Sequence, residues 1–520
     1  MSVFDTRSSG VLMPIFSLPS DSGIGTLGRG AYDFIRFLAS SGQKYWQILP
    51  ICPPAKEDSP YLSYSSRAGN PYLIDIDWLV GDGWLTKDEV KASNVKPSKH
   101  IKEDSWISSG KIDYKQIKES RSKVFSFLYK NFFNKVPNDY MDFCSRHSDW
   151  LDDYALFMTL LEYHKFAELP DWEDKYKFRD KTALKKFKES HISTFQYYQM
   201  LQYFFYTQWK SLHTFAHKNN IKIIGDIPLY VSLTSADAWV DPKIFKIDEN
   251  YNASVLSGCP ANKSNRKNAV GQVWDSPVYD WEYQKKTDYA WWKNRLNDAF
   301  KLYDIIRIDH FKGFESFYNI DAKTRDTVNG EWKPGPGIDF WNSCKKHFNE
   351  LPVFAEDLGI ITPKLEKLLK DCNFDGMCVL QYGFNKKSEE YTKENKYKSK
   401  NRYLPHNYRK NQVVYADTHD TPPLYGWLNS APEEVISNAM SYYETNDIDE
   451  LFDKMLMSIA ESRANTCIYS AQDLLKLGLD AKNNTPGTVG TNWMWQLTEE
   501  EFNYLDSNKL KDMTIKTERL

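Results

Sequence analysis

Three kinds of signal are scarce in this 520-residue sequence: paired cysteines, an excess of one charge, and long apolar runs. The 7 cysteines are far apart, and no two have the C-x-x-C spacing of zinc sites and redox motifs. Their odd number and scatter argue against a disulfide framework and are typical of a reducing compartment. The sequence therefore predicts free thiols rather than a structural cross-link or a cysteine-based metal site.

The charges nearly balance, with 67 Lys and Arg against 70 Asp and Glu and a formal net charge of −3. Such a balance does not favour a nucleic-acid or membrane-surface partner. No segment approaches the ~20 apolar residues of a membrane span. The N-terminal apolar run is broken by Pro14 and lacks a basic region before it, so it is a poor signal peptide. We therefore expect a cytoplasmic protein, either a monomer or a homodimer.

Aromatic residues are abundant instead, because Phe, Trp and Tyr make up 15% of the chain. Flat rings with a polar edge suit sugar-binding clefts, where they stack on the apolar face of a pyranose. The same rings also fill ordinary hydrophobic cores. Composition alone leaves these two interpretations of the aromatic excess equally open.

Short apolar runs that end in polar, Gly or Pro residues recur along the chain and read as buried parallel strands. Helix-length segments separate most of them, such as Ala31–Ser41 and Pro363–Lys370, the latter with Thr362 as its N-cap. Alternating strands and helices predict an α/β fold, a (β/α)₈ TIM barrel with helical insertions. The predicted strands are Lys44–Pro50, Pro71–Asp77, Ile221–Pro228, Tyr303–Phe311, Leu351–Gly359, Gly376–Gly383, Gln412–His419 and Thr466–Asp473.

The domain organisation follows from the places where this alternation of strands and helices is interrupted. Residues 1–80 start the barrel, and residues 81–218 form a mostly helical insertion with amphipathic helices at Arg121–Asn134 and Tyr154–Phe166. Residues 219–520 complete the catalytic barrel, with loop insertions near 245–288 and 386–411. No separate C-terminal module is needed.

Active sites of such barrels lie where strands end, so carboxylates at strand ends are the candidates. Arg307 and Asp309 are two residues apart on one strand and project to the same side. The neighbouring guanidinium is expected to keep Asp309 ionised with a lowered pKa, as a nucleophile requires. A structural ion pair in a buried strand is an equally good interpretation.

Glu356 and Asp357 follow the apolar residues Val353 and Phe354. Successive side chains on a strand point to opposite faces, so only one of the two carboxyl groups can enter the barrel mouth. Desolvation there raises the pKa of a carboxyl group, as a general acid requires. The alternative is that both face solvent in a turn that leads into the next helix.

Two further strand ends carry polar residues. His419 and Asp420 precede a double proline that cannot continue the strand, and the pair could hold substrate hydroxyls. A lone histidine is otherwise more often a satisfied core residue. Asp226 closes another strand, where a structural role and a substrate role are equally supported.

Carboxylates, an arginine and a histidine on separate strand ends are what glycosidic-bond chemistry with retention requires. In retaining enzymes the two working carboxyl groups lie about 5 Å apart. This chemistry needs no metal and no cofactor, and the sequence shows no His/Cys cluster that offers a metal site.

At these residues the chain resembles the amylomaltases, which are 4-α-glucanotransferases of glycoside hydrolase family 77. The resemblance runs from about Ser9 to Leu497 and is weakest in the helical insertion. The matching segments are Ser22–Gly25, Tyr45–Gln47, Asp58–Tyr61, Ala68–Asp75, Gly225–Pro228, Ser235–Asp237, Arg307–Phe311, Ala355–Gly359, His419–Asp420, Asn484–Thr488 and Asn492–Trp493.

The resemblance implies a retaining transfer of α-1,4-glucan segments between maltooligosaccharides. It makes Asp309 the nucleophile, Glu356 the acid/base and Asp420 the carboxylate that stabilises the transition state. Arg307 and His419 are then expected to hold this set in place.

The resemblance also places three more residues at the substrate. Asp226 and His310 are expected at or directly behind the sugar, and Tyr61 is expected to contact it near the scissile bond.

This chain departs from the family pattern in two loops. The active-site lid, which usually reads Pro-Pro-Asp-Tyr-Phe, is replaced around Pro260–Asn268 by a lysine- and asparagine-rich stretch without an aromatic residue. The loop after Asp420 carries Thr421, Pro422 and Pro423 in place of Asn-Asp-Thr. Acceptor handling and the ratio of transfer to hydrolysis therefore stay open.

Two alternatives to a transferase remain. A hydrolase would share the covalent intermediate and resolve it with water. A non-catalytic glucan-binding protein would be expected to lack Asp309 or Glu356, and this chain has both.

Overall fold

A computed structural model describes residues 3–55, 57–261, 271–384, 391–392 and 394–520 of the chain. Its centre is an eight-stranded sheet in the order β11-β8-β5-β2-β1-β14-β13-β12, and the paired strands run parallel. The Ala355 N–H donates to the carbonyl oxygen of Asp375 (2.9 Å), which links β11 to the start of β12. The barrel strands are β1 (Ser8–Leu12), β2 (Tyr45–Gln47), β5 (Lys222–Ile227), β8 (Ile305–Ile308), β11 (Val353–Ala355), β12 (Gly376–Val379), β13 (Gln412–Tyr415) and β14 (Thr466–Ser470).

The predicted (β/α)₈ barrel is confirmed, but one predicted strand is wrong. Pro71–Asp77 forms a 3-10 helix, η2 (Pro71–Leu73), and the start of α2 (Ile76–Gly81). Pro71 cannot donate to a sheet, and the Asp75 carboxylate accepts from the Trp78 N–H (2.6 Å) and caps α2. The remaining barrel strand is β1, a short segment that the sequence analysis did not predict to be a strand.

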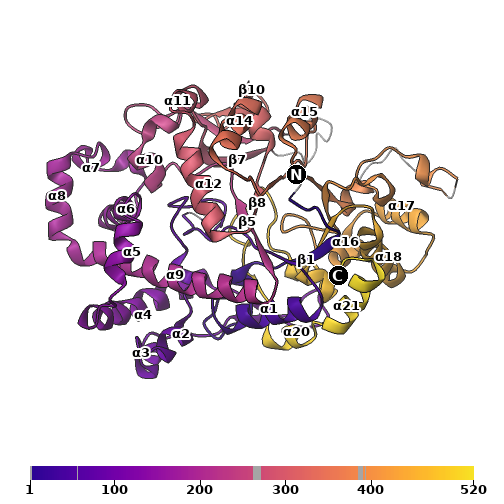
Figure 1. Ribbon diagram of the computed structural model, residues 1–520, viewed down its shortest axis with the longest axis horizontal. Coiled ribbons are helices and arrows are strands. Elements are labelled where there is room, and N and C mark those ends of the chain that lie inside the picture. Colours follow the sequence, from indigo (N-terminus) through magenta and orange to yellow (C-terminus); the bar gives the residue numbers. More distant parts are fainter. Residues whose placement is uncertain (1–2, 56, 262–270, 385–390, 393) are drawn as a thin grey trace.

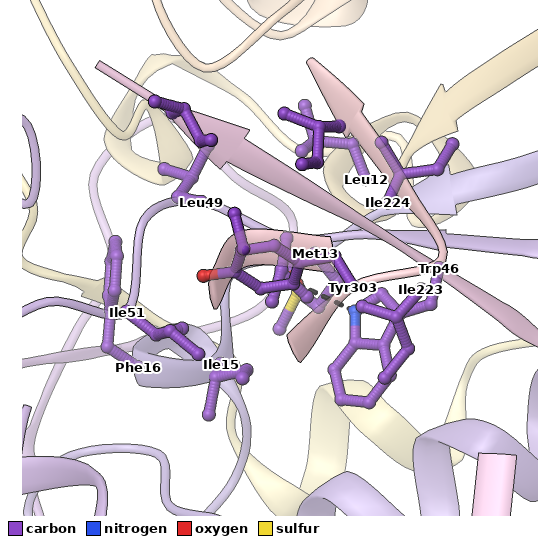
Figure 2. Packing of buried hydrophobic residues seen from close by; sticks show 14 of the residues in the cluster. Leu12, Met13, Ile15, Phe16, Trp46, Leu49, Ile51, Ile223, Ile224 and Tyr303 are labelled. Carbon is purple, nitrogen blue, oxygen red and sulfur yellow. Dashed lines mark hydrogen bonds between the residues drawn. The ribbon is translucent and has the colours of Figure 1, made fainter. Parts of the chain in front are cut away.

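The barrel core is packed with large side chains rather than hollow. Trp46 on β2 is fully buried, and its Nε1–H donates to the Met13 carbonyl oxygen (2.8 Å), the dashed line in Figure 2. Gly225 on β5 leaves space for the ring of Tyr303, because an added Cβ would lie 2.2 Å from Tyr303 Cγ. Such packing gives the strand ends a rigid base.

A large helical lobe lies between β2 and β5, on the left of Figure 1. Its longest member, α9, runs from this lobe to the barrel, where β5 begins. The predicted helices Arg121–Asn134 and Tyr154–Phe166 correspond to α4 and α6, although α6 ends at Tyr163. The helices are α3 (Lys87–Ala92), α4 (Tyr114–Asn134), α5 (Tyr140–Arg146), α6 (Leu151–Tyr163), α7 (Asp174–Lys177), α8 (Lys181–Ser190) and α9 (Ile192–Lys218).

Two small antiparallel sheets lie outside the barrel sheet. One follows the order β10-β9-β6-β7 and uses residues both before and after β8, where the sequence suggested a loop insertion near 245–288. The other joins two strands of the 81–218 segment to the C-terminal part of the chain. The strands are β6 (Val255–Cys259), β7 (Gln272–Pro277), β9 (Ser316–Asp321) and β10 (Glu331–Pro334), and then β3 (Lys99–Ile101), β4 (Ser109–Lys111) and β15 (Trp495–Gln496).

The remaining helices cover the barrel strands and their connections. The predicted helix after Thr362 is confirmed, since the Thr362 hydroxyl accepts from the Leu365 N–H (3.1 Å). No helix of the described part of the chain combines the length and apolar character needed to cross a membrane. The helices are α1 (Arg29–Ser40), α10 (Ala236–Val240), α11 (Trp281–Lys286), α12 (Ala290–Leu302), α13 (Lys312–Glu315), α14 (Gly337–His347), α15 (Pro363–Cys372), α16 (Leu424–Ser430), α17 (Glu433–Tyr443), α18 (Ile448–Glu461), α19 (Ala471–Leu474), α20 (Glu499–Asn503) and α21 (Ser507–Lys516).

Candidate active site

The candidate residues meet at the carboxyl ends of neighbouring strands. In the β5–β8 register, Asp226 pairs with Arg307. In the β8–β11 register, Ala355 pairs with Ile308, so the next residues, Asp309 and Glu356, leave their strands at the same level. Adjacent strands lie about 4.8 Å apart, so the two carboxyl groups start from neighbouring backbone positions.

Arg307 joins two of these carboxylates. Its Nη1 donates to both Asp226 oxygens (2.8 and 2.7 Å) and to Asp309 Oδ1 (3.0 Å). The side chains of Arg307 and Asp226 are 4% and 0% exposed, whereas that of Asp309 is 26% exposed. Asp226 is therefore a buried counter-ion of the arginine, and Asp309 is the member of the trio that reaches open space.

The pKa of Asp309 departs from the expectation based on sequence. Burial raises it above its ordinary value, the positive charge of Arg307 lowers it, and the nearby carboxylate of Asp420 raises it again. The net shift is upward, so the predicted lowering by Arg307 was wrong in its net direction. The cause is desolvation by atoms from the whole barrel mouth, which the strand sequence does not show.

Glu356 accepts hydrogen bonds on both carboxyl oxygens, from the N–H groups of His310 (2.9 Å) and Leu358 (2.7 Å). Burial raises the pKa of Glu356 to about 8, with the Arg307 charge opposing and the Asp309 charge reinforcing the shift. This upward shift confirms the sequence-based expectation for Glu356. Asp357 lies elsewhere, fully buried against the Met377 N–H (2.7 Å) and Arg402 (2.8 Å).

Tyr61 bridges two of the other candidates. Its hydroxyl donates to Asp226 Oδ2 (2.6 Å) and lies 2.8 Å from His419 Nε2. Since the single hydroxyl proton goes to the carboxylate, we infer that His419 donates from Nε2 to the tyrosine oxygen. Burial lowers the pKa of His419, which favours the neutral imidazole.

Asp420 stands at the open side of the same network. One of its oxygens lies 3.4 Å from His419 Nε2, and the other accepts from the side-chain amide of Asn484 (2.6 Å). Its side chain is 40% exposed, more than that of Asp309 (26%) or Asp226 (0%). This bond from Asn484 restrains the orientation of the Asp420 carboxylate.

His310 is held by both backbone and ring contacts. Its φ of +46° is unusual for a non-glycine residue and turns the chain immediately after Asp309. The ring meets Trp274 of β7 edge to face, with centroids 4.8 Å apart. Burial lowers the pKa of His310 to about 4, so the ring is neutral near pH 7.

Three residues that shape this site were not predicted as site residues from the sequence: Asn484, Trp274 and Trp493. Trp493 packs near the rings of Tyr61 (5.6 Å between centroids) and His419 (6.1 Å). Asn484 and Trp493 fall in segments that match the family, which was the available signal. Trp274 belongs to a region that the sequence suggested was a loop, and it had no signal of its own.

The abundant aromatic residues lie both in the hydrophobic core and beside the candidate site. Many aromatic residues are buried in the core, such as Trp46, Trp239 and Trp341. A few, such as Tyr61 and Trp493, border the candidate site.

The altered lid lies mostly outside the described residues, because residues 262–270 are not described. In the other altered loop, the Pro422 carbonyl oxygen accepts from the side chain of Gln381 (2.8 Å).

A parallel barrel whose strand ends hold paired carboxylates, a buried arginine and neutral histidines defines a class: barrel enzymes that act on glycosidic bonds. Comparison with known proteins narrows that class. A profile of the 4-alpha-glucanotransferase family matches residues 13–501. The chain therefore belongs to the 4-alpha-glucanotransferase family and is a glucan-transferring enzyme.

Individual relatives from this family are similar to this protein over nearly the whole chain. The 4-alpha-glucanotransferase of Clostridium butyricum is 38% identical and is matched over 96% of this chain and 99% of its own length. The Thermus thermophilus enzyme of the same name is 34% identical, with 99% of both chains covered. The amylomaltase of Streptococcus agalactiae, solved in complex with acarbose, superimposes with a TM-score of 0.89 at 35% identity, over 99% of both chains.

Proposed function

We propose that this enzyme moves α-1,4-glucan segments between maltooligosaccharides by retaining double displacement, with Asp309 as nucleophile and Glu356 as acid/base. One observation carries the proposal. Asp309 and Glu356 leave adjacent strands at the same level, and Arg307 bonds directly to Asp309, whereas Glu356 accepts from two backbone N–H groups. The arginine favours the ionised form of Asp309, and burial favours the protonated form of Glu356.

In the first step, an oxygen of Asp309 attacks the anomeric carbon of the donor and the glycosidic bond breaks. Glu356 gives its proton to the departing 4-oxygen, which leaves a glucosyl ester on Asp309. In the second step, the Glu356 carboxylate takes the proton of an acceptor 4-hydroxyl. That oxygen attacks the anomeric carbon, and the ester bond breaks with retention of configuration.

The other residues have supporting roles in this mechanism. Asp420, whose side chain is 40% exposed, would hold sugar hydroxyls as positive charge develops on the ring. Arg307 and Asp226 hold the nucleophile in position, and the Tyr61–His419 pair orients Asp420. His310 is neutral and can hydrogen-bond to a sugar hydroxyl.

The substrate assignment has a second support in a relative. The Streptococcus agalactiae amylomaltase was solved with acarbose bound, and this chain resembles it over 99% of its length. We also propose a role in starch or glycogen metabolism in a reducing, cytoplasmic compartment, since all seven cysteines are free thiols.

The test is incubation of the purified enzyme with maltotriose as the only sugar. A ladder of longer oligosaccharides together with glucose is expected. Glucose and maltose without longer products would show that water resolves the intermediate and that the enzyme is a hydrolase. No turnover of maltotriose or longer maltooligosaccharides would instead favour a glucan-binding protein.

The residue roles have their own test. Asp309→Ala and Glu356→Gln are each expected to lower kcat by several orders of magnitude while substrate binding is largely kept. Calorimetric titration with a maltooligosaccharide separates lost binding from lost chemistry. Near-normal turnover of either variant would refute its assigned role.

A further inference from the structure

A second cluster of chemically active side chains lies at the end of the barrel opposite the candidate active site. His213 and His217 are one helical turn apart on α9, and both face Asp304, the residue before β8. His213 Nε2 lies 3.2 Å from Asp304 Oδ2, and His217 Nε2 lies 2.7 Å from Asp304 Oδ1. The three possible ligand atoms all lie within 4.8 Å of one another.

Neighbouring groups hold this cluster in place. Asp304 Oδ2 also accepts from the Ile223 N–H of β5 (2.8 Å), which fixes the carboxylate between two strands. The His213 ring is nearly parallel to that of Trp209 (6.1 Å between centroids, 10° between planes). Asp304 and His213 are 17% and 19% exposed, and His217 is 50% exposed, so an ion can enter from solvent.

We propose that His213, His217 and Asp304 form a binding site for a divalent late transition-metal ion, and zinc is the ion used in the test. Two histidines at i and i+4 on one helix face, completed by a carboxylate, are a ligand set that suits zinc. Nitrogen donors also favour zinc, nickel or copper over magnesium or calcium.

The geometry is close to what such an ion needs. Zn–N and Zn–O distances near 2.0–2.2 Å place neighbouring ligand atoms of a tetrahedron about 3.4 Å apart. The His213–Asp304 separation of 3.2 Å nearly meets that spacing. His217 Nε2 lies 2.7 Å from the other carboxylate oxygen, Asp304 Oδ1, so the half-exposed His217 must move by side-chain rotation to share an ion with His213. Solvent can supply the fourth ligand.

The site joins α9 to the amino ends of β5 and β8, while the candidate catalytic residues lie at the carboxyl ends of the strands. The ion would therefore fasten the long helix of the helical lobe to the barrel rather than take part in glucan transfer. The sequence gives no sign of this metal site, because Asp304 is 87 residues from His217 and only the fold brings them together.

The experiment uses the full chain after dialysis against a chelator, titrated with Zn²⁺ in competition with a chromophoric chelator. One ion per chain is expected, together with a rise in Tm. His217→Gln is expected to weaken binding about 100-fold or more, since even partners behind the ligands contribute 10- to 100-fold. The exposed His347, outside the cluster, supplies the control variant His347→Gln, which should bind as the unaltered chain does.

A second measurement keeps the test independent of folding. Co²⁺ bound at the site should show visible absorption bands typical of four-coordinate nitrogen and oxygen ligands, and these should disappear in His217→Gln. Glucan transfer should stay within about twofold with and without zinc, because the two sites lie at opposite ends of the barrel. Equal zinc affinity in His217→Gln and the unaltered chain would overturn the proposal and show that Asp304 only accepts hydrogen bonds from two histidines.

Discussion

Removing a single oxygen atom, in Tyr61→Phe, tests how the hydrogen-bond network controls the chemistry. The ring and its packing near His419 and Trp493 are kept, and only the hydroxyl is lost. That hydroxyl donates to the Asp226 carboxylate at 2.6 Å and lies 2.8 Å from His419 Nε2. The variant therefore releases the His419 ring without opening a large cavity.

The magnitude follows from the contacts that remain. A hydrogen bond to a charged group contributes about 1.5–3 kcal/mol. Asp226 keeps both bonds from Arg307, so we expect the lower part of that range, about 1.5 kcal/mol. If this energy orients His419 and Asp420 for the transition state, kcat/KM falls about tenfold, because about 1.4 kcal/mol corresponds to a factor of ten.

The assay is kcat/KM for glucose release from maltotriose, measured together with Tm. Tyr206→Phe on α9 is the matched control, since the Tyr206 hydroxyl donates to the Arg67 carbonyl oxygen (2.7 Å), a bond between α9 and the segment that follows β2. The control should lower Tm with kcat/KM unchanged. If Tyr61→Phe keeps kcat/KM within twofold of the unaltered enzyme, the network does not orient the catalytic groups and the reasoning is refuted.

Two further predictions concern pH and packing. Burial raises the pKa of Glu356 from an ordinary 4.5 to about 8, so kcat/KM should fall as pH rises above about 8 and the acid loses its proton. The stability that the neutral Glu356 carboxyl contributes is fully present below the unfolded-state pKa and is lost as pH rises through the folded-state pKa. Glu356→Gln cannot titrate, and its Tm should decline less between about pH 5 and pH 8; equal slopes would contradict the assignment. Gly225→Ala places a methyl group 2.2 Å from Tyr303 Cγ and should cost about 1–3 kcal/mol of unfolding free energy in urea titrations. Gly81→Ala, with no atom within 4 Å of the added Cβ, is its control. Equal stability of the two variants would show that the barrel core shifts to accommodate the methyl group at residue 225.

Much of the fold was predictable because its signals are local. The strand before Asp309 and the helix after Thr362 follow from apolar runs and capping residues a few positions apart. The strand prediction failed at Pro71–Asp77, where proline and two side-chain caps turned an apolar run into helices. It missed β1, which is a strand because β2 and β14 flank it on either side.

The candidate site divides in the same way. Residue type and strand position were enough to predict Asp309, Glu356 and Asp420 as carboxylates at strand ends. The partner of Asp420 could not be predicted from spacing, because Asn484 is 64 residues away. The net pKa shift of Asp309 was predicted with the wrong sign, because the sequence shows the neighbouring arginine but not the surrounding atoms.

The amino-acid sequence by itself determined the alternation of strands and helices, the family and the acidic residues available for catalysis, since these depend on neighbours along the chain. Only the tertiary structure decided which strand completes the barrel, how far each carboxyl group is desolvated, and that His213 and His217 meet Asp304. Those properties depend on distances between residues far apart in sequence, and folding sets such distances by packing the whole chain around one core.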